Sequence, residues 1–118
     1  VYAAFPILAE RRHQRAGTLS GGQQQQLAIG RVLIGRPSLI LLDEPSEGIQ
    51  PSIVQDIARI VTELNRSGGI TIVFVEQNLD MIRAMAQRAY VMDKGRVVAE
   101  MGAEDLHDRD AVRRHLAV

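Results

Sequence analysis

Two short apolar runs, separated by one amphipathic segment, constrain the fold of this chain most strongly. Residues 39–42 read Leu-Ile-Leu-Leu, and residues 70–75 form a second run rich in β-branched residues. Runs of this length without polar alternation are typical of strands covered on both faces. Between them, Pro51 suits the first turn of a helix, and apolar residues recur at helical spacing from Ile53 to Leu64. Strands that alternate with amphipathic helices predict an α/β fold with a mostly parallel sheet.

Length and charge exclude several classes of protein. The chain has 118 residues, which supports one domain at most, and its 14 basic and 14 acidic side chains give a formal net charge of zero. A neutral chain offers no global electrostatic attraction for a nucleic acid, so we expect no nucleic-acid partner. The absence of cysteine excludes a disulfide framework and a thiol nucleophile. The apolar runs are far shorter than the ~20 residues that span a bilayer.

The clearest helix start lies at Ser20. Ser20 and Gln23 have the spacing of a capping box, and apolar residues recur at helical spacing until Gly35 and Pro37 end the pattern. The recurring residues are Leu27, Ala28, Val32 and Ile34. Glycines at positions 21 and 22 allow a backbone to approach a bulky anion, and the positive end of the helix dipole favours phosphate. An ordinary capped helix explains the same residues equally well.

Acidic residues follow both predicted strands. Asp43 and Glu44 end the first run, and residues 76–78 (Glu-Gln-Asn) follow the second. The carboxyl ends of parallel strands are where such sheets bind ligands, so we expect chemistry at this edge. A carboxylate in this position can hold Mg²⁺, and a second one beside it can orient or deprotonate an attacking water. Taken alone, the acidic pair is explained better by a solvated turn that Pro45 completes.

The remaining elements are predicted from local signals. Residues 5–15 suggest a short helix, and Asn78 or Asp80 suits the cap of another helix that continues to about residue 86. Asp93-Lys94-Gly95 is typical of a hairpin turn between two strands. Two short polar helical segments follow, at residues 103–106 and 110–116.

Together, the glycine-containing cap and the acidic strand end resemble the ATP-binding-cassette (ABC) family. In that family a signature sequence is followed by a helix and then by the Walker B strand, and here Ser20 precedes Asp43 with the same elements between them. The resemblance implies the C-terminal half of a P-loop NTPase core of the RecA-like type, with flanking helices and a C-terminal β-hairpin. It assigns nucleotide binding through the signature to Ser20, Gly21, Gly22 and Gln23. It also makes Asp43 the magnesium ligand and Glu44 the catalytic glutamate.

Two positions depart from the usual pattern of the family. The family's D-loop commonly ends in aspartate, whereas residues 46–49 here read Ser-Glu-Gly-Ile. The switch position, which the resemblance counts as catalytic, is commonly histidine and is Gln77 here. Glutamine can donate and accept hydrogen bonds and so can sense a γ-phosphate, but it cannot carry a proton. Residues 47–51 and 75–78 look like those of importer subunits for branched-chain amino acids and, more closely, urea.

The chain lacks the phosphate-binding Walker A loop of the family. That loop needs glycines leading into Gly-Lys-Ser or Gly-Lys-Thr, and the single lysine, Lys94, has Asp93 before it and Gly95 after it. We therefore expect residues 1–118 to be a partial ABC ATPase domain, the C-terminal portion of a longer cassette. In this interpretation residues 1–18 are the tail of a helical subdomain, residues 19–34 are the signature and its helix, and residues 38–118 belong to the ATPase core.

The function that the resemblance implies is ATP hydrolysis coupled to uptake of branched-chain amino acids or urea. ATP and Mg²⁺ are the implied cofactors. The implied partners are a second ATP-binding subunit in a head-to-tail dimer and transmembrane permease subunits at the cytoplasmic face of the inner membrane. The fragment alone is expected to be inactive. Two alternatives remain: a fragment of a non-transport ABC-type ATPase, in chromosome maintenance or DNA repair, and a non-catalytic ABC-like interaction domain.

Overall fold

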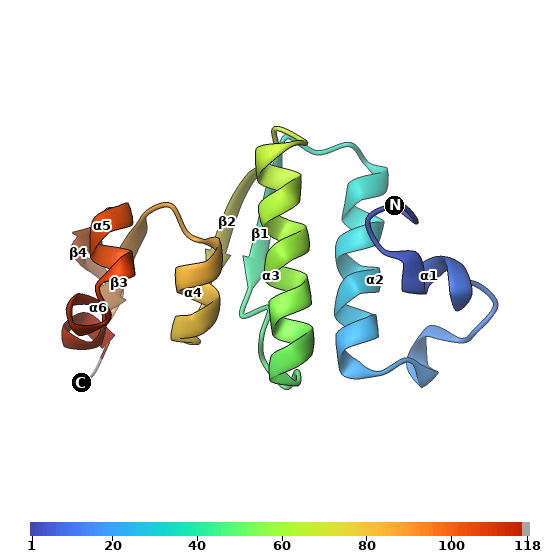
Figure 1. Cartoon of the computed structure of the whole chain (residues 1–118), viewed down its shortest axis with the longest axis horizontal. Helices are drawn as coiled ribbons and strands as arrows, with labels where there is room; N and C mark the ends of the chain where they lie inside the picture. Colours follow the sequence, from blue (N-terminus) through green and yellow to red (C-terminus); the bar gives the residue numbers. More distant parts are fainter. Residues whose placement is uncertain (117–118) are drawn as a thin grey trace. The chain divides into compact units, whose positions relative to one another are not determined.

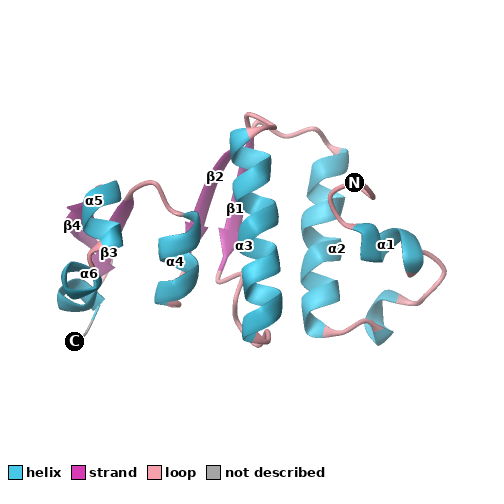
Figure 2. Ribbon diagram, viewed as in Figure 1, coloured by secondary structure: helices cyan, strands magenta, loops and turns pink. Residues whose placement is uncertain are grey.

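The computed structural model describes residues 1–116, which form two units (Figure 1). The first unit spans Val1–Glu76, and the second begins at Gln77. Both units contain helices and strands, as expected for an α/β protein (Figure 2). None of the helices within residues 1–116 is both long enough and apolar enough to cross a bilayer.

The first unit contains three α-helices and two parallel strands. In chain order these are α1 (Pro6–Glu10), a 3₁₀ turn (Ala16–Thr18), α2 (Gly21–Ile34), β1 (Leu39–Asp43), α3 (Pro51–Arg66) and β2 (Thr71–Val75). The register of the parallel pair places Leu39 beside Thr71 and Asp43 beside Val75. The two carboxyl ends therefore lie side by side, as the sequence predicts.

The start of α2 confirms the predicted capping box. The Ser20 hydroxyl oxygen accepts a hydrogen bond from the Gln23 backbone N–H at 3.2 Å, and the Gln23 side-chain oxygen accepts one from the Ser20 N–H at 3.2 Å. The helix expected over residues 5–15 is shorter than predicted, because α1 ends at Glu10. The polar residues 11–15 are exposed and provide no apolar face that could extend it.

The core of the first unit lies around α3 and between α1 and α2. One face of α3 is buried, with Val54, Ile57 and Val61 at helical spacing. In α2 the buried positions are Ile29 and Gly30, with Gly22 at the start of the helix. The apolar repeat predicted for α2 does not mark its buried face, since Val32 and Ile34 are exposed. Ile29 and the close contacts at Gly22 and Gly30, and not Val32 or Ile34, therefore pack α2 against its neighbours.

The prediction that both strands are covered on two faces is wrong for the part of the chain that the structure describes. Side chains alternate between the two faces of a strand, and Ile40 is 3% exposed whereas Leu41 is 72% exposed. In β2, Val73 and Val75 are likewise exposed. Within residues 1–116, only one face of this sheet is covered.

The second unit contains a hairpin and three short helices. These elements are α4 (Leu79–Met85), β3 (Ala89–Asp93), β4 (Arg96–Met101), α5 (Ala103–His107) and α6 (Arg109–Leu116). Asn78 caps α4, because its side-chain oxygen accepts a hydrogen bond from the Met81 N–H at 3.0 Å. Strands β3 and β4 are antiparallel, and Lys94 and Gly95 have positive φ at the predicted turn. The buried residues are Met81, Ile82, Val91, Met101, Leu106, Ala111 and Val112.

Candidate functional site

The candidate site begins where β1 ends. Asp43 is the last residue of β1, and its neighbour in the register is Val75 of β2. The next backbone N–H, that of Glu44, donates to the Val75 carbonyl oxygen at 2.8 Å. Glu44 itself has φ +47°, in the left-handed region that residues with a Cβ atom rarely adopt. The chain therefore turns sharply at Glu44 while remaining bonded to the neighbouring strand.

The loop after β1 is tied to the end of β2 by one carboxylate. The Ser46 N–H donates to Oε2 of Glu76 at 3.1 Å, and the Ser46 hydroxyl donates to Oε1 at 2.8 Å. Both bonds are partly buried, so water competes for them less than at the surface. Through these two hydrogen bonds, Glu76 fixes the position of the segment that carries Glu44. Sequence reasoning assigned no role to Glu76, although its place directly after an apolar strand was a signal for one.

Acidic side chains gather around Glu44. Repulsion from Glu47, a side-chain hydrogen bond with Glu47 and desolvation raise the pKa of Glu44, and the charges of Asp43 and Glu76 raise it further. Within residues 1–116, Asp43, Glu44 and Glu47 form no ion pair. Negative charge is thus concentrated at the strand ends, and no protein cation pairs with these three carboxylates. This arrangement favours binding of an external cation.

The donor set fits Mg²⁺ in a nucleotide site better than a metal cage made by the protein alone. The described residues contain no group of three or more His, Cys, Asp or Glu side chains placed to hold a metal. Mg²⁺ bound with nucleotides commonly uses only one or two carboxylates and takes its other oxygen ligands from water and phosphates. Asp43 is exposed at the strand end and supplies such a carboxylate.

The glycines at the start of α2 have two different environments. Gly22 is buried, and a Cβ atom there would overlap the Ile53 side chain of α3, so packing alone accounts for glycine at this position. Gly21 is exposed, and a Cβ atom there would lie 3.6 Å from the Gly48 carbonyl oxygen. The start of α2 therefore lies beside the loop that follows β1.

The helix start retains donors that an anion can use. The capping box satisfies the N–H groups of Ser20 and Gln23, and within the described residues those of Gly21 and Gly22 have no acceptor. Two such N–H groups at a helix N-terminus suit a phosphate oxygen. The Gln23 side chain is engaged in the cap. Gln77 follows Glu76 directly and begins the second unit, and its role stays a prediction.

Comparisons with known proteins find relatives over most of the chain. The ABC transporter family model matches residues 3–47. The chain is 53% identical over 98 residues to the high-affinity branched-chain amino acid transport ATP-binding protein BraG of Pseudomonas aeruginosa, covering 83% of this chain and 42% of that protein.

Solved structures show the same fold. The ADP conformation of an ATP-binding cassette of an ABC transporter matches 98% of this chain and 49% of its own, at a TM-score of 0.75 and 36% identity. A dimeric bacterial ABC transporter cassette matches 75% of this chain and 38% of its own, at a TM-score of 0.68 and 31% identity. The chain spans less than half the length of these relatives. The α/β fold predicted from the sequence is confirmed, and the chain belongs to the ATP-binding-cassette family.

Proposed function

We propose that this chain is the part of an ATP-hydrolysing transport subunit that carries the signature and the Walker B carboxylates. The observation that best supports this is the joining of two strand ends, where Asp43 and Glu44 lie against β2 and Glu76 holds Ser46. Such an edge is where α/β sheets place their ligands. The similarity to a branched-chain amino acid transport ATP-binding protein directs the proposal toward amino acid uptake.

The proposed role of the α2 start is to bind the γ-phosphate of ATP held by a second subunit. The free N–H groups of Gly21 and Gly22 would donate to phosphate oxygens. The Ser20 hydroxyl oxygen accepts from the helix backbone, so its own hydrogen is available to the same phosphate. Gln23 supports this arrangement through the cap.

The proposed roles at the strand ends divide between the carboxylates and Gln77. Asp43 would hold Mg²⁺, which when bound neutralises charge on the nucleotide phosphates. Glu44 would accept a hydrogen bond from the attacking water and orient it, and its raised pKa makes it a stronger base than an ordinary glutamate. Gln77 would sense the γ-phosphate by donating a hydrogen bond.

The proposed partners follow from the same assignment. A phosphate at the α2 start needs a Walker A loop from elsewhere, because this chain contains none. We propose a second ATP-binding subunit in a head-to-tail dimer, together with permease subunits that place the assembly at the cytoplasmic face of the inner membrane. The substrate class is branched-chain amino acids, and the urea alternative has only the motifs at residues 47–51 and 75–78 in its favour.

A chimera tests this function directly. The aligned segment of the P. aeruginosa relative would be replaced by the corresponding residues of this chain, and ATP turnover and branched-chain amino acid uptake would be measured in the assembled transporter. We expect the chimera to support both activities. The Glu44→Gln chimera should lose about a hundredfold or more in turnover, because glutamine keeps the shape of glutamate but is not a base.

The same assay provides a control and distinguishes the proposed function from the two alternatives. A Glu10→Gln chimera removes an exposed acidic residue from α1 and should retain full activity. An assembled chimera without turnover would overturn the catalytic proposal and favour the interaction domain. Turnover without uptake would favour an ATPase that does not transport.

A further inference from the structure

A small cavity in the second unit collects charged residues that the proposed function does not use. Its volume is about 120 Å³, and it lies between α4 and α6. The lining residues are Leu79, Asp80, Arg83, Arg109, Val112 and Arg113. None of them belongs to the signature, the strand ends or the switch position.

The lining is strongly positive. Three arginines and a single acidic residue, Asp80, line the cavity. Arg109 and Arg113 are four positions apart on α6, so they share one face of the helix and repel each other. Arg83 of α4 is half-buried, and its Nε donates to the Leu106 carbonyl oxygen at 3.3 Å. This bond holds the Arg83 side chain in place and leaves its terminal nitrogens for another acceptor.

These charges are not neutralised inside the described chain. Within residues 1–116, none of the three arginines forms an ion pair with a carboxylate, and neither does Asp80. The nearby acid Asp108 is engaged elsewhere, because its Oδ1 accepts from the Asp110 N–H at 3.0 Å and the Ala111 N–H at 3.4 Å. The three arginines therefore have no carboxylate partner within the described residues, and an anionic ligand could accept hydrogen bonds from them.

We propose that this cavity binds a phosphoryl group, a doubly charged oxyanion of phosphate size. Arginine side chains present paired N–H donors that match phosphate oxygens, and three arginines against one aspartate leave two positive charges for a dianion. The cavity is well below the ~300 Å³ or more of sites that enclose whole organic ligands, so it accommodates the phosphoryl group and not a complete nucleotide. Val112, which is 1% exposed, provides an apolar wall that strengthens the ionic contacts.

A titration of the whole chain with inorganic phosphate tests the site. Backbone amide NMR spectra would be recorded at constant ionic strength, with chloride replacing phosphate in the reference samples. We expect saturable shifts concentrated in residues 79–83 and 109–113. The Arg109→Gln/Arg113→Gln double variant should weaken binding about tenfold or more, because both exposed guanidinium groups donate to the anion.

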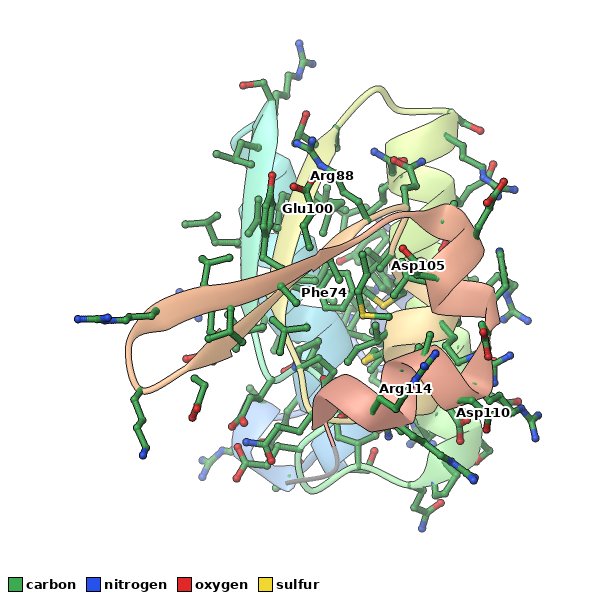
Figure 3. The ribbon with its side chains drawn as sticks, turned by 90° about the vertical axis from the view of Figure 1, so that its left-hand side faces the viewer. Phe74, Arg88, Glu100, Asp105, Asp110 and Arg114 are labelled. Carbon is green, nitrogen blue, oxygen red and sulfur yellow. The ribbon has the colours of Figure 1, made fainter. Side chains whose placement is uncertain are left out.

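A matched variant separates the site from general charge effects. Arg114, labelled on α6 in Figure 3, follows Arg113 in the sequence but does not line the cavity. Its Nε donates back along the helix to the Asp110 carbonyl oxygen at 3.3 Å. Arg114→Gln should therefore change phosphate affinity by less than about twofold. Asp80→Asn should strengthen binding, because it removes the one negative charge of the lining. This gain cannot arise from unfolding.

Vesicles distinguish two sources of the phosphoryl group. If binding to vesicles containing phosphatidic acid, with phosphatidylcholine vesicles as reference, is lost in the double variant, the group is a lipid headgroup. If phosphate titrates the site and these vesicles do not bind, the ligand is a free phosphate. The proposal is overturned if neither probe binds the folded chain, or if Arg114→Gln weakens binding as much as the double variant does.

Discussion

At the scale of single residues, the loop that carries Glu44 contains two residues with left-handed backbone conformation. Glu44 has φ +47°, and Gly48 follows with φ +71°. Left-handed conformations disfavour any residue with a Cβ atom, and such residues persist where the surroundings hold them. Here the Glu44 N–H is bonded to Val75, and Ser46 is bonded to Glu76 on the same strand end. The proposed catalytic glutamate is thus positioned by contacts on both of its sides.

The first prediction concerns Gly48. We expect Gly48→Ala to lower the free energy of unfolding by about 1 kcal/mol, because alanine is strained at positive φ. A Cβ atom at Gly48 would meet nothing within 4 Å, so steric overlap cannot contribute. Gly17 has equally open surroundings and no positive φ, and Gly17→Ala should therefore change stability by less than about 0.5 kcal/mol. Urea unfolding of both variants measures the difference, and equal effects would contradict the assignment to backbone strain.

The second prediction concerns the pKa of Glu44. Glu47 is the largest cause of the raised value, so Glu47→Gln should return the pKa toward 4.5. A raised pKa in the folded chain means that stability is lost as the pH rises through that pKa, because the charged form is the disfavoured one. The variant should therefore be more stable than the parent at neutral pH, and this advantage should vanish below pH 4.5.

Carboxyl chemical shifts, followed by NMR in the presence of EDTA, measure the titration of Glu44. Glu10→Gln removes an exposed acid from α1 and serves as the control. An unchanged Glu44 titration in the Glu47→Gln variant would show that repulsion from Glu47 is not the cause.

At the scale of elements, glycine positions α2. Gly22 approaches Ile53 of α3, and at Gly30 a Cβ atom would lie 3.1 Å from Leu8 Cδ1 of α1 and closer still to Val1. The same helix thus meets a neighbour closely at both glycines. This packing fixes the start of α2, where the proposed phosphate donors lie, relative to α3 and to the loop before it.

The third prediction tests this contact. Gly22→Ala should destabilise the chain by about 1–3 kcal/mol, because the new methyl group overlaps Ile53. Gly21→Ala, one position earlier in the same turn, should be neutral or slightly stabilising, because its Cβ atom would make only an ordinary contact. In an Ile53→Ala background, which removes the overlapping Cγ2 atom and keeps Cβ at 3.2 Å, the Gly22→Ala penalty should be smaller, and a double-mutant cycle from urea unfolding measures this coupling. If the effects of Gly22→Ala and Ile53→Ala on the free energy of unfolding are additive, the penalty does not arise from contact with Ile53.

Local signals predict these elements better than they predict their packing. The capping box of Ser20 and Gln23 is confirmed because its partners lie within one turn. The apolar repeat of α2 is misleading because Val32 and Ile34 are exposed, and periodicity does not encode which neighbour a helix meets. Within the candidate site, the convergence of the strand ends follows from parallel pairing. The bonds from Ser46 to Glu76 join residues 30 positions apart, so no local pattern could predict them.

At the scale of the whole molecule, the β1–β2 sheet has an exposed apolar face within the described residues. Leu41 is 72% exposed and its register partner Val73 is 51% exposed, with Leu39 and Val75 on the same face. The apolar sequences of both strands predict that the two faces of the sheet are buried. Within the described residues, only one face is buried. An exposed apolar face of this kind promotes association.

The last prediction is that this face drives self-association of the chain. The Leu41→Thr/Val73→Thr double variant should have a lower apparent mass at high concentration, measured by size-exclusion chromatography with light scattering. Its free energy of unfolding should change by less than about 1 kcal/mol, because both side chains are already exposed and threonine favours strands. The control, Ile40→Thr, alters the opposite, buried face of β1 and should cost about 3 kcal/mol. If the double variant associates as strongly as the parent, another surface is responsible, and the exposed hairpin residues Tyr90, Met92, Val97 and Val98 become the next to substitute.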